Sequence, residues 1–143
     1  MAVPDRLTQT ETAFANPTTW FRVALVTALV SISYLATTPT QYEVVVAVSD
    51  KVEHIAAFWV LGLLADFSFP RSGFGWPKIG LLLLYALAIE TVQSFLPYRS
   101  SEWQDLVAGA IGMAAYGLSV PLIKKTGLAG WRWRKTNPIG AGS

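Results

Sequence analysis

Four long apolar stretches, separated by short polar connections, constrain the fold of this chain more than any other feature. They cover about residues 20–38, 52–69, 78–96 and 103–123. A bilayer core about 30 Å thick is crossed by roughly 20 apolar residues in a helix. Pro97 follows the third stretch, as expected where a helix stops. The sequence therefore predicts an all-α fold, an integral membrane bundle of four antiparallel transmembrane helices.

Composition supports a membrane protein and excludes several other classes. The 143 residues are 52% hydrophobic and 14% charged, whereas about 25% charged residues is usual for soluble domains. Because the chain has no cysteine, disulfides and thiolate chemistry are excluded. The net charge of +2 is small, and there is no glycine-rich phosphate loop or basic and aromatic sheet pattern. We predict no nucleic-acid partner and no cofactor.

The basic residues predict how the bundle is oriented in the cytoplasmic (inner) membrane. If both termini are cytoplasmic, only Lys51 and Arg99 of the 11 Lys and Arg residues face outside. This bias is what the positive-inside rule describes. We expect a cytoplasmic tail over 1–19, a four-helix transmembrane domain over 20–123 and a basic cytoplasmic tail over 124–143. Residues 1–19 lack the basic start and apolar core of a signal peptide.

Polar residues gather at those ends of the stretches that this topology brings to the outer face. Asp50 and His54 share a helix face at the start of the second stretch, and Glu90 and Gln93 share one near the end of the third. An ionisable group inside a span costs about 2.5–3.5 kcal/mol on insertion scales, so a semi-buried Glu90 implies a partner or a ligand. We predict an outer-face pocket lined by Asp50, Lys51, His54, Glu90, Gln93, Arg99 and Asp105.

Glu90 and His54 are the predicted catalytic residues of this pocket. A semi-buried carboxylate and an imidazole that titrates near neutrality are suited to proton transfer. In the alternative interpretation, Glu90 forms an ion pair with Lys51 or Arg99 that only fixes helix packing.

The remaining members form the predicted ligand-binding set. Lys51 and Arg99 are expected to bind an anion such as a lipid phosphate, because arginine binds phosphate through two hydrogen bonds. Asp50, Gln93 and Asp105 complete this set. Alternatively, the basic side chains only reach toward the interface and Asp105 caps its helix. The single histidine excludes a multi-histidine metal site and no metal is predicted, while a mixed site of His54 with Asp50, Glu90 and Asp105 is left as an alternative.

Three segments carry a resemblance to a known family: DKVEHIAAF at 50–58, ETVQSFLPYR at 90–99 and DLVAGAIG at 105–112. This pattern resembles the VanZ-like family of small bacterial integral membrane proteins. The family pattern is roughly D-K-x-x-H-x-x-x-F, then E-x-x-Q-x-F-x-P-x-R, then D-x-x-x-N-x-x-G. One position departs from it, because the asparagine of the family falls on Gly109. Either a ligand is bound differently here, or glycine packing replaces a helix-pairing amide.

The resemblance implies a role in the cell envelope and no defined reaction. The family takes its name from a member linked to low-level resistance to the glycopeptide teicoplanin. We predict that the protein binds or modifies an anionic envelope lipid or cell-wall precursor at the outer-face pocket. One alternative is a non-catalytic membrane scaffold or accessory subunit, in which Ala108 and Gly112 serve a protein partner of the fourth helix. A proton or ion pathway is a further alternative.

Overall fold

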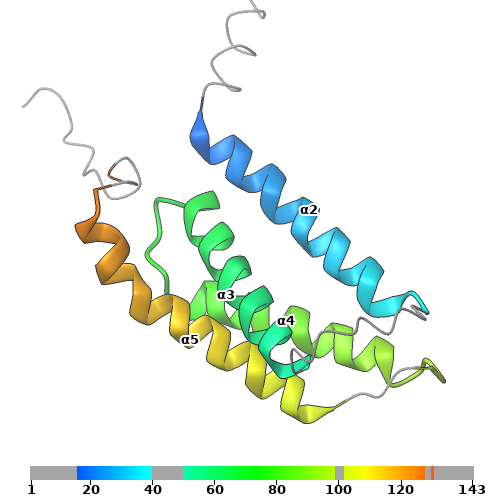
Figure 1. The fold of residues 1–143 in the computed structure, drawn as a ribbon. Helices are drawn as coiled ribbons and strands as arrows, with labels where there is room; N and C mark the ends of the chain where they lie inside the picture. Colours follow the sequence, from blue (N-terminus) through cyan, green and yellow to red (C-terminus); the bar gives the residue numbers. More distant parts are fainter. Residues whose placement is uncertain (1–15, 40–49, 99–101, 128–129, 131–143) are drawn as a thin grey trace, which may run out of the picture.

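The structure, a computed structural model, describes residues 16–39, 50–98, 102–127 and 130, and these contain four helices and no strand. The helices are α2 (Pro17–Thr37), α3 (Asp50–Ser68), α4 (Trp76–Gln93) and α5 (Trp103–Lys125). Each lies within a few residues of the apolar stretch that predicts it. Successive helices run in alternating directions, as the colours in Figure 1 show. The all-α prediction is confirmed for these residues, and the predicted tails lie largely outside them.

Local signals explain where the helices begin and end. Asn16 caps α2, because its side-chain oxygen accepts a hydrogen bond of 3.0 Å from the backbone N–H of Thr18. Pro17 occupies the first turn, where a missing N–H costs nothing. Helix α5 carries Asp105 in its first turn and two lysines in its last, which complements the helix dipole.

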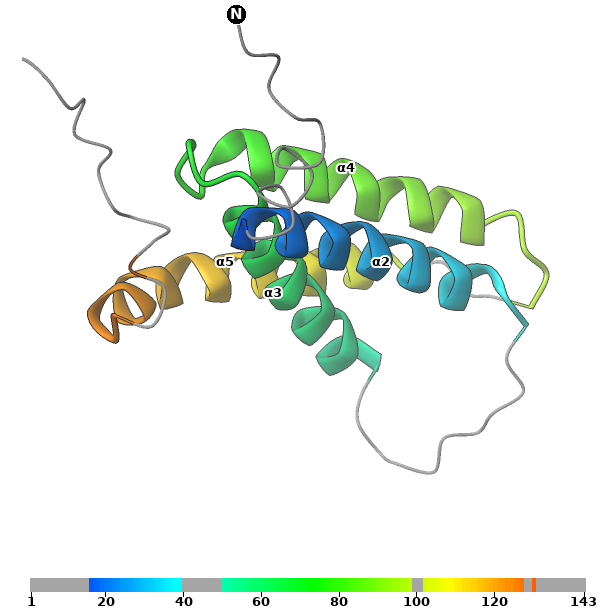
Figure 2. The same cartoon turned by 90° about the horizontal axis from the view of Figure 1, so that it is seen from above.

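Helix α3 lies at the centre of the bundle. It packs most extensively against α5, next against α2, and least against α4. In Figure 1, α2 and α5 lie on opposite sides with α3 and α4 between them. Seen from above, α4 runs alongside α2 while α3 crosses them obliquely (Figure 2). The buried apolar core comes from all four helices and includes Leu25, Phe58, Leu61, Leu82 and Met113.

Two glycines of α5 allow its close approach to α3. A Cβ on Gly112 would overlap the backbone carbonyl oxygen of Ile55, and one on Gly109 would lie 3.0 Å from the Phe58 ring. A larger residue at either position would push the two helices apart or displace the ring. Glycine at position 109, where the VanZ-like pattern has asparagine, therefore serves helix packing here.

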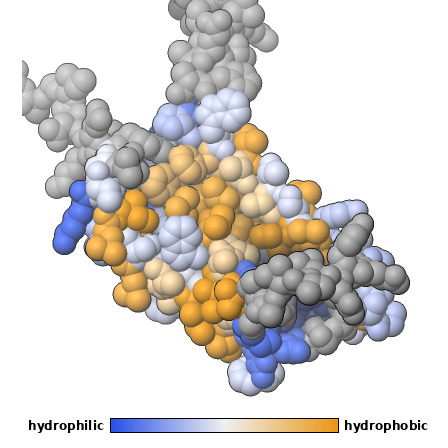
Figure 3. Space-filling view, viewed as in Figure 1, coloured by the Kyte–Doolittle hydropathy of each residue, from blue (hydrophilic) through white to orange (hydrophobic). Residues whose placement is uncertain are grey.

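The bundle has an apolar exterior and buried charges. Large hydrophobic side chains are exposed along the helices, among them Val30, Leu81 and Leu118. Apolar residues cover the middle of the face in Figure 3, and hydrophilic residues gather toward its ends. Such extensive exposed apolar surface marks a membrane or partner contact. Among the described residues, in contrast, four charged side chains are at most 7% exposed, namely Asp66, Lys78, Glu90 and Asp105.

Among the described helices, α2 and α5 are long and apolar enough to cross a membrane, with mean hydropathies of 1.5 and 1.8. Helices α3 and α4 do not reach this combination of length and hydropathy. Helix α3 includes Lys51, Glu53 and Asp66, and α4 includes Lys78 and Glu90. Asp66, Lys78 and Glu90 are buried, so these three charges do not interrupt the apolar exterior of α3 and α4.

Candidate functional site

Three ionisable side chains from three helices meet at the end of the bundle where α3 and α5 begin and α4 ends. His54 of α3, Glu90 of α4 and Asp105 of α5 each offer one possible ligand atom, and these atoms lie within 4.8 Å of one another. Glu90 and Asp105 are buried, and His54 is half-buried. We call these three residues the His54 cluster. The structure thus brings together three of the residues that the sequence assigned to one pocket.

Lys51 borders this cluster and is paired with two carboxylates. Its Nζ lies 2.7 Å from Oε2 of Glu102 and 3.1 Å from Oδ1 of Asp105. Glu102 was not among the predicted site residues, because the sequence alone does not reveal which loop carboxylate faces the start of α3. The predicted anion-binding lysine is therefore held by acidic groups in this structure.

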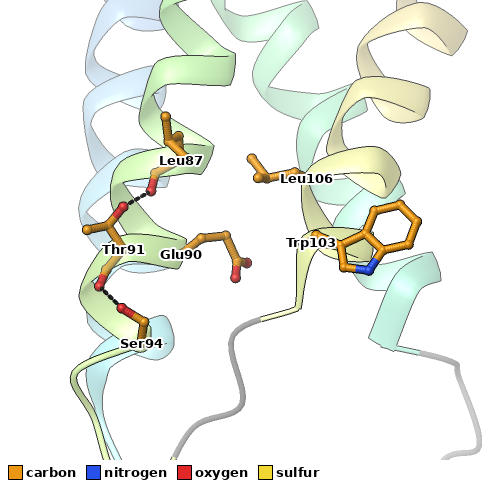
Figure 4. Close-up of a pocket in the computed structure, with 6 residues that line it drawn as sticks. All are labelled: Leu87, Glu90, Thr91, Ser94, Trp103 and Leu106. Carbon is orange, nitrogen blue, oxygen red and sulfur yellow. Dashed lines mark hydrogen bonds between the residues drawn. The ribbon is translucent and has the colours of Figure 1, made fainter.

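A groove between α4 and α5 leads to Glu90. It has a volume of about 260 Å³ and is lined by Leu87, Glu90, Thr91, Ser94, Trp103 and Leu106. Figure 4 shows the Glu90 carboxylate extending from α4 toward the space between the two helices, with Leu106 and Trp103 on the α5 side. Trp103 is 72% exposed and Leu87 is 51% exposed, so the groove opens onto the apolar exterior.

The two hydroxyl groups of this groove on α4 form hydrogen bonds within the helix. The Thr91 hydroxyl donates to the carbonyl oxygen of Leu87 at 2.7 Å, and the Ser94 hydroxyl donates to that of Thr91 at 2.7 Å (Figure 4). Hydrogen bonds of this kind present methyl or methylene groups to the groove. The spacing of Leu87, Thr91 and Ser94, one helical turn apart, is the signal that would have found this wall from the sequence.

The remaining predicted site residues are placed less directly. The Gln93 side-chain amide donates to the carbonyl oxygen of Ala36 on α2 at 3.1 Å, so it joins α4 to α2, although it is only three residues from Glu90. Asp50 begins α3, one turn before His54, but its side chain lies outside what the structure describes. Arg99 also lies outside the described residues, and its role stays a prediction.

A second buried polar cluster lies toward the other end of the bundle. Lys78 Nζ is 2.8 Å from Oδ1 of Asp66, and the Tyr116 hydroxyl donates to Oδ2 of Asp66 at 3.0 Å. Lys78 Nζ also donates to the carbonyl oxygens of Phe69 and Ser72, at 3.0 and 2.8 Å. All three ammonium protons of Lys78 thus have acceptors. We call Asp66, Lys78 and Tyr116 the Asp66 cluster, and its closed network is typical of a structural role.

The chemistry available at the His54 cluster follows from its donors. An imidazole and two carboxylates within reach of one another can share a proton or bind a cation. The adjoining groove can hold an apolar chain beside Glu90. The combination is suited to an amphiphile whose polar end reaches the cluster.

Comparisons with known proteins agree with this membrane-type bundle. The sequence profile of the VanZ/LLP1 family matches residues 5–124, a range that includes both polar clusters and all four helices except the last residue of α5. Searches of curated proteins and of solved structures find no match.

Proposed function

The chain belongs to the VanZ/LLP1 family, and from this premise we propose that it binds or modifies an anionic envelope lipid or lipid-linked cell-wall precursor. The proposed site is the His54 cluster together with the groove between α4 and α5. The observation that carries the proposal is a groove that opens on the apolar exterior and ends at a buried carboxylate. A lipid can enter such a groove from the side without leaving the bilayer.

We further propose that all four helices span the bacterial cytoplasmic membrane, with both termini in the cytoplasm. The shortest helix, α4, has 18 residues, and at 1.5 Å per residue this is about 27 Å, close to the hydrocarbon thickness. Its charged residues, Lys78 and Glu90, are buried inside the bundle, which is where charged residues of spans are tolerated. The distribution of basic residues supports this orientation, in which the His54 cluster would lie at the outer face.

Each residue of the site has a proposed role in binding the lipid. Lys51 and Arg99 hold the anionic group, and Glu90 with His54 organises or transfers protons. Asp50 and Asp105 shape the pocket around them, and Gln93 fixes the position of α4 beside it through its hydrogen bond to Ala36 of α2. Lys51 becomes available to an anion if the ligand draws it from Glu102, whose carboxylate is 45% exposed and is readily solvated.

The proposal is tested by native mass spectrometry of the protein released from its own membrane in mild detergent. Leu87→Trp fills the groove, and Lys51→Ala removes one basic group. Leu84→Trp is the matched control, because Leu84 is on the same helix and 61% exposed but does not line the groove. We expect a discrete anionic lipid on the wild type and on Leu84→Trp, and its loss from the other two variants.

Two outcomes would count against lipid binding at this site. The same lipids on all four proteins would mean that the groove is not their binding site. Bare protein in every sample, with unchanged thermal stability, would favour the scaffold interpretation, in which the polar residues only set helix packing.

A link to teicoplanin is a separate part of the proposal. Expression in a susceptible host is expected to raise the teicoplanin concentration needed for inhibition, and Glu90→Gln is expected to abolish the rise at equal accumulation in the membrane. No rise with the wild type would remove the link while leaving the lipid proposal intact.

A further inference from the structure

We propose that His54, Glu90 and Asp105 bind a divalent transition-metal ion of the Zn²⁺ or Mn²⁺ type. The three residues come from three different helices, and one possible ligand atom of each lies within 4.8 Å of the others. The sequence predicted no metal, because its single histidine excludes a multi-histidine site. A mixed site needs only that one imidazole and carboxylates brought to it by other helices.

The donor set and its spacing fit such an ion. One imidazole nitrogen with two carboxylate oxygens suits Zn²⁺ or Mn²⁺ better than Ca²⁺ or Mg²⁺, which prefer all-oxygen sites. A tetrahedral ion with bonds of about 2.1 Å holds its ligand atoms about 3.4 Å apart. Side-chain rotations that bring these atoms together by up to about 1.4 Å are therefore sufficient to bind it.

The charges of the surrounding residues also favour a cation. Two carboxylates, Glu90 and Asp105, are buried close together, and a third, Glu102, borders them through Lys51. Lys51 is shared between Glu102 and Asp105, so one ammonium faces two carboxylates. Carboxylates held close together attract positive charge, and a divalent ion bound by Glu90 and Asp105 supplies it between them.

The same ion gives the proposed site a means of binding an anion. Three protein ligands leave a coordination position open, as in catalytic metal sites, and the groove reaches the Glu90 side of the cluster. A phosphate oxygen of a lipid can occupy that position. This last step rests on the proposed function, whereas metal binding itself does not.

The first test measures metal binding by the full-length protein in detergent. The protein is stripped with a chelator, titrated with Zn²⁺ alone and analysed for bound metal. We expect one tightly bound Zn²⁺ per chain in the wild type. The affinity for Zn²⁺ should be lower by about 100-fold or more in His54→Gln, Glu90→Gln and Asp105→Asn, because even the loss of a residue that only hydrogen-bonds to a metal ligand lowers metal affinity by about 10–100-fold. Glu53→Gln is the matched control, because Glu53 is an exposed neighbour of His54 on α3, and its affinity should equal that of the wild type.

The second test gives a signature that a merely structural role would not produce. The chain has no cysteine, so a thiolate introduced by His54→Cys is the only sulfur anion present. Loading this variant with Co²⁺ is expected to produce a thiolate-to-cobalt charge-transfer band. The band should be lost in the double variant His54→Cys/Glu90→Gln and be absent from Glu53→Cys.

The outcomes separate this inference from the proposed function. Stoichiometric Zn²⁺ with no bound lipid would support the metal site and overturn the lipid proposal. An anionic lipid retained by chelator-treated protein, with no Zn²⁺ bound by the wild type, would overturn the metal site and leave a proton shared between His54 and the carboxylates. Equal Zn²⁺ binding by the wild type and all ligand variants would also overturn it.

Discussion

The two buried polar clusters of this bundle solve the same physical problem in different ways. In the Asp66 cluster one carboxylate faces one ammonium, and the tyrosine hydroxyl and two backbone carbonyls complete the hydrogen bonds. In the His54 cluster two buried carboxylates and an imidazole from three helices lie close together, with Lys51 paired to Asp105 and an open groove beside Glu90. The first arrangement is balanced and closed, while the second adjoins a space that a ligand can enter. Buried charge is therefore better evidence for a binding site where a groove reaches it than where a network encloses it.

The largest loss of stability is expected from removing the cation of the Asp66 cluster. Lys78→Met leaves the Asp66 carboxylate, which is 0% exposed, without its cation. Removing one partner of a buried pair costs about 3–5 kcal/mol, and we expect a loss of this size in denaturant unfolding in detergent. The double variant Lys78→Met/Asp66→Leu should recover most of it. A single variant as stable as the wild type would show that the network contributes little.

Disrupting the glycine contact between α3 and α5 should cause a smaller loss of stability. In Gly112→Ala the new Cβ meets the carbonyl oxygen of Ile55, and overpacking of this kind costs about 1–3 kcal/mol. Gly117→Ala is the control, since its Cβ would lie 3.7 Å from the Phe74 ring, an ordinary contact. The same unfolding measurement applies, and equal effects at both positions would contradict the close approach. Because His54 adjoins Ile55, Zn²⁺ binding should also weaken only in Gly112→Ala.

Glu90→Gln is expected to separate function from stability. The change removes one of two neighbouring buried carboxylates, so the free energy of unfolding should stay within about 1 kcal/mol of the wild type, while Zn²⁺ and lipid binding are lost. Thermal unfolding and metal analysis on the same sample test this directly. A destabilisation as large as that of Lys78→Met would instead assign Glu90 to helix packing.

The smallest effect is expected from replacing Lys51, and it should change the affinities for Zn²⁺ and for the anionic lipid in opposite directions. Lys51→Met removes the positive charge that lies 3.1 Å from an Asp105 oxygen and competes with a metal ion there. We expect Zn²⁺ affinity to rise by up to about tenfold, since tenfold corresponds to 1.4 kcal/mol, and binding of the anionic lipid to fall. A fall in both affinities would show that Lys51 only holds α3 and α5 in register.

Much of the fold was predictable because hydropathy and proline placement are local properties. The apolar stretch of about 78–96 and its bounding prolines predicted α4 within a few residues of Trp76–Gln93. The prediction that His54, Glu90 and Asp105 share one end followed from antiparallel order alone. The burial of Asp66, Lys78 and Glu90 was harder to predict, because hydropathy registers only that a residue is charged, and packing decides whether it faces inward.

Pairings between helices were not predictable in the same way. Nothing local indicates that Glu102 binds Lys51, or that Gln93 contacts Ala36 instead of the site. These contacts depend on how each helix is rotated about its own axis. The spacing of residues along the sequence does not define that rotation finely enough to predict which side chains meet. The groove was missed for the same reason, since it exists only where two particular faces of α4 and α5 diverge.

The tight glycine contact between α3 and α5 has a consequence for how the His54 cluster closes. His54 and Asp105 are carried by the most extensively packed pair of helices, whereas Glu90 is carried by α4, which packs less on either of them. The ligand atoms of His54 and Asp105 are thus positioned relative to each other during folding. Ordering them costs little further entropy when an ion binds. Glu90 lines the groove and supplies the third donor, so the proposed ion would connect the preorganised pair to the groove wall, and an occupant of the groove would lie beside the ion.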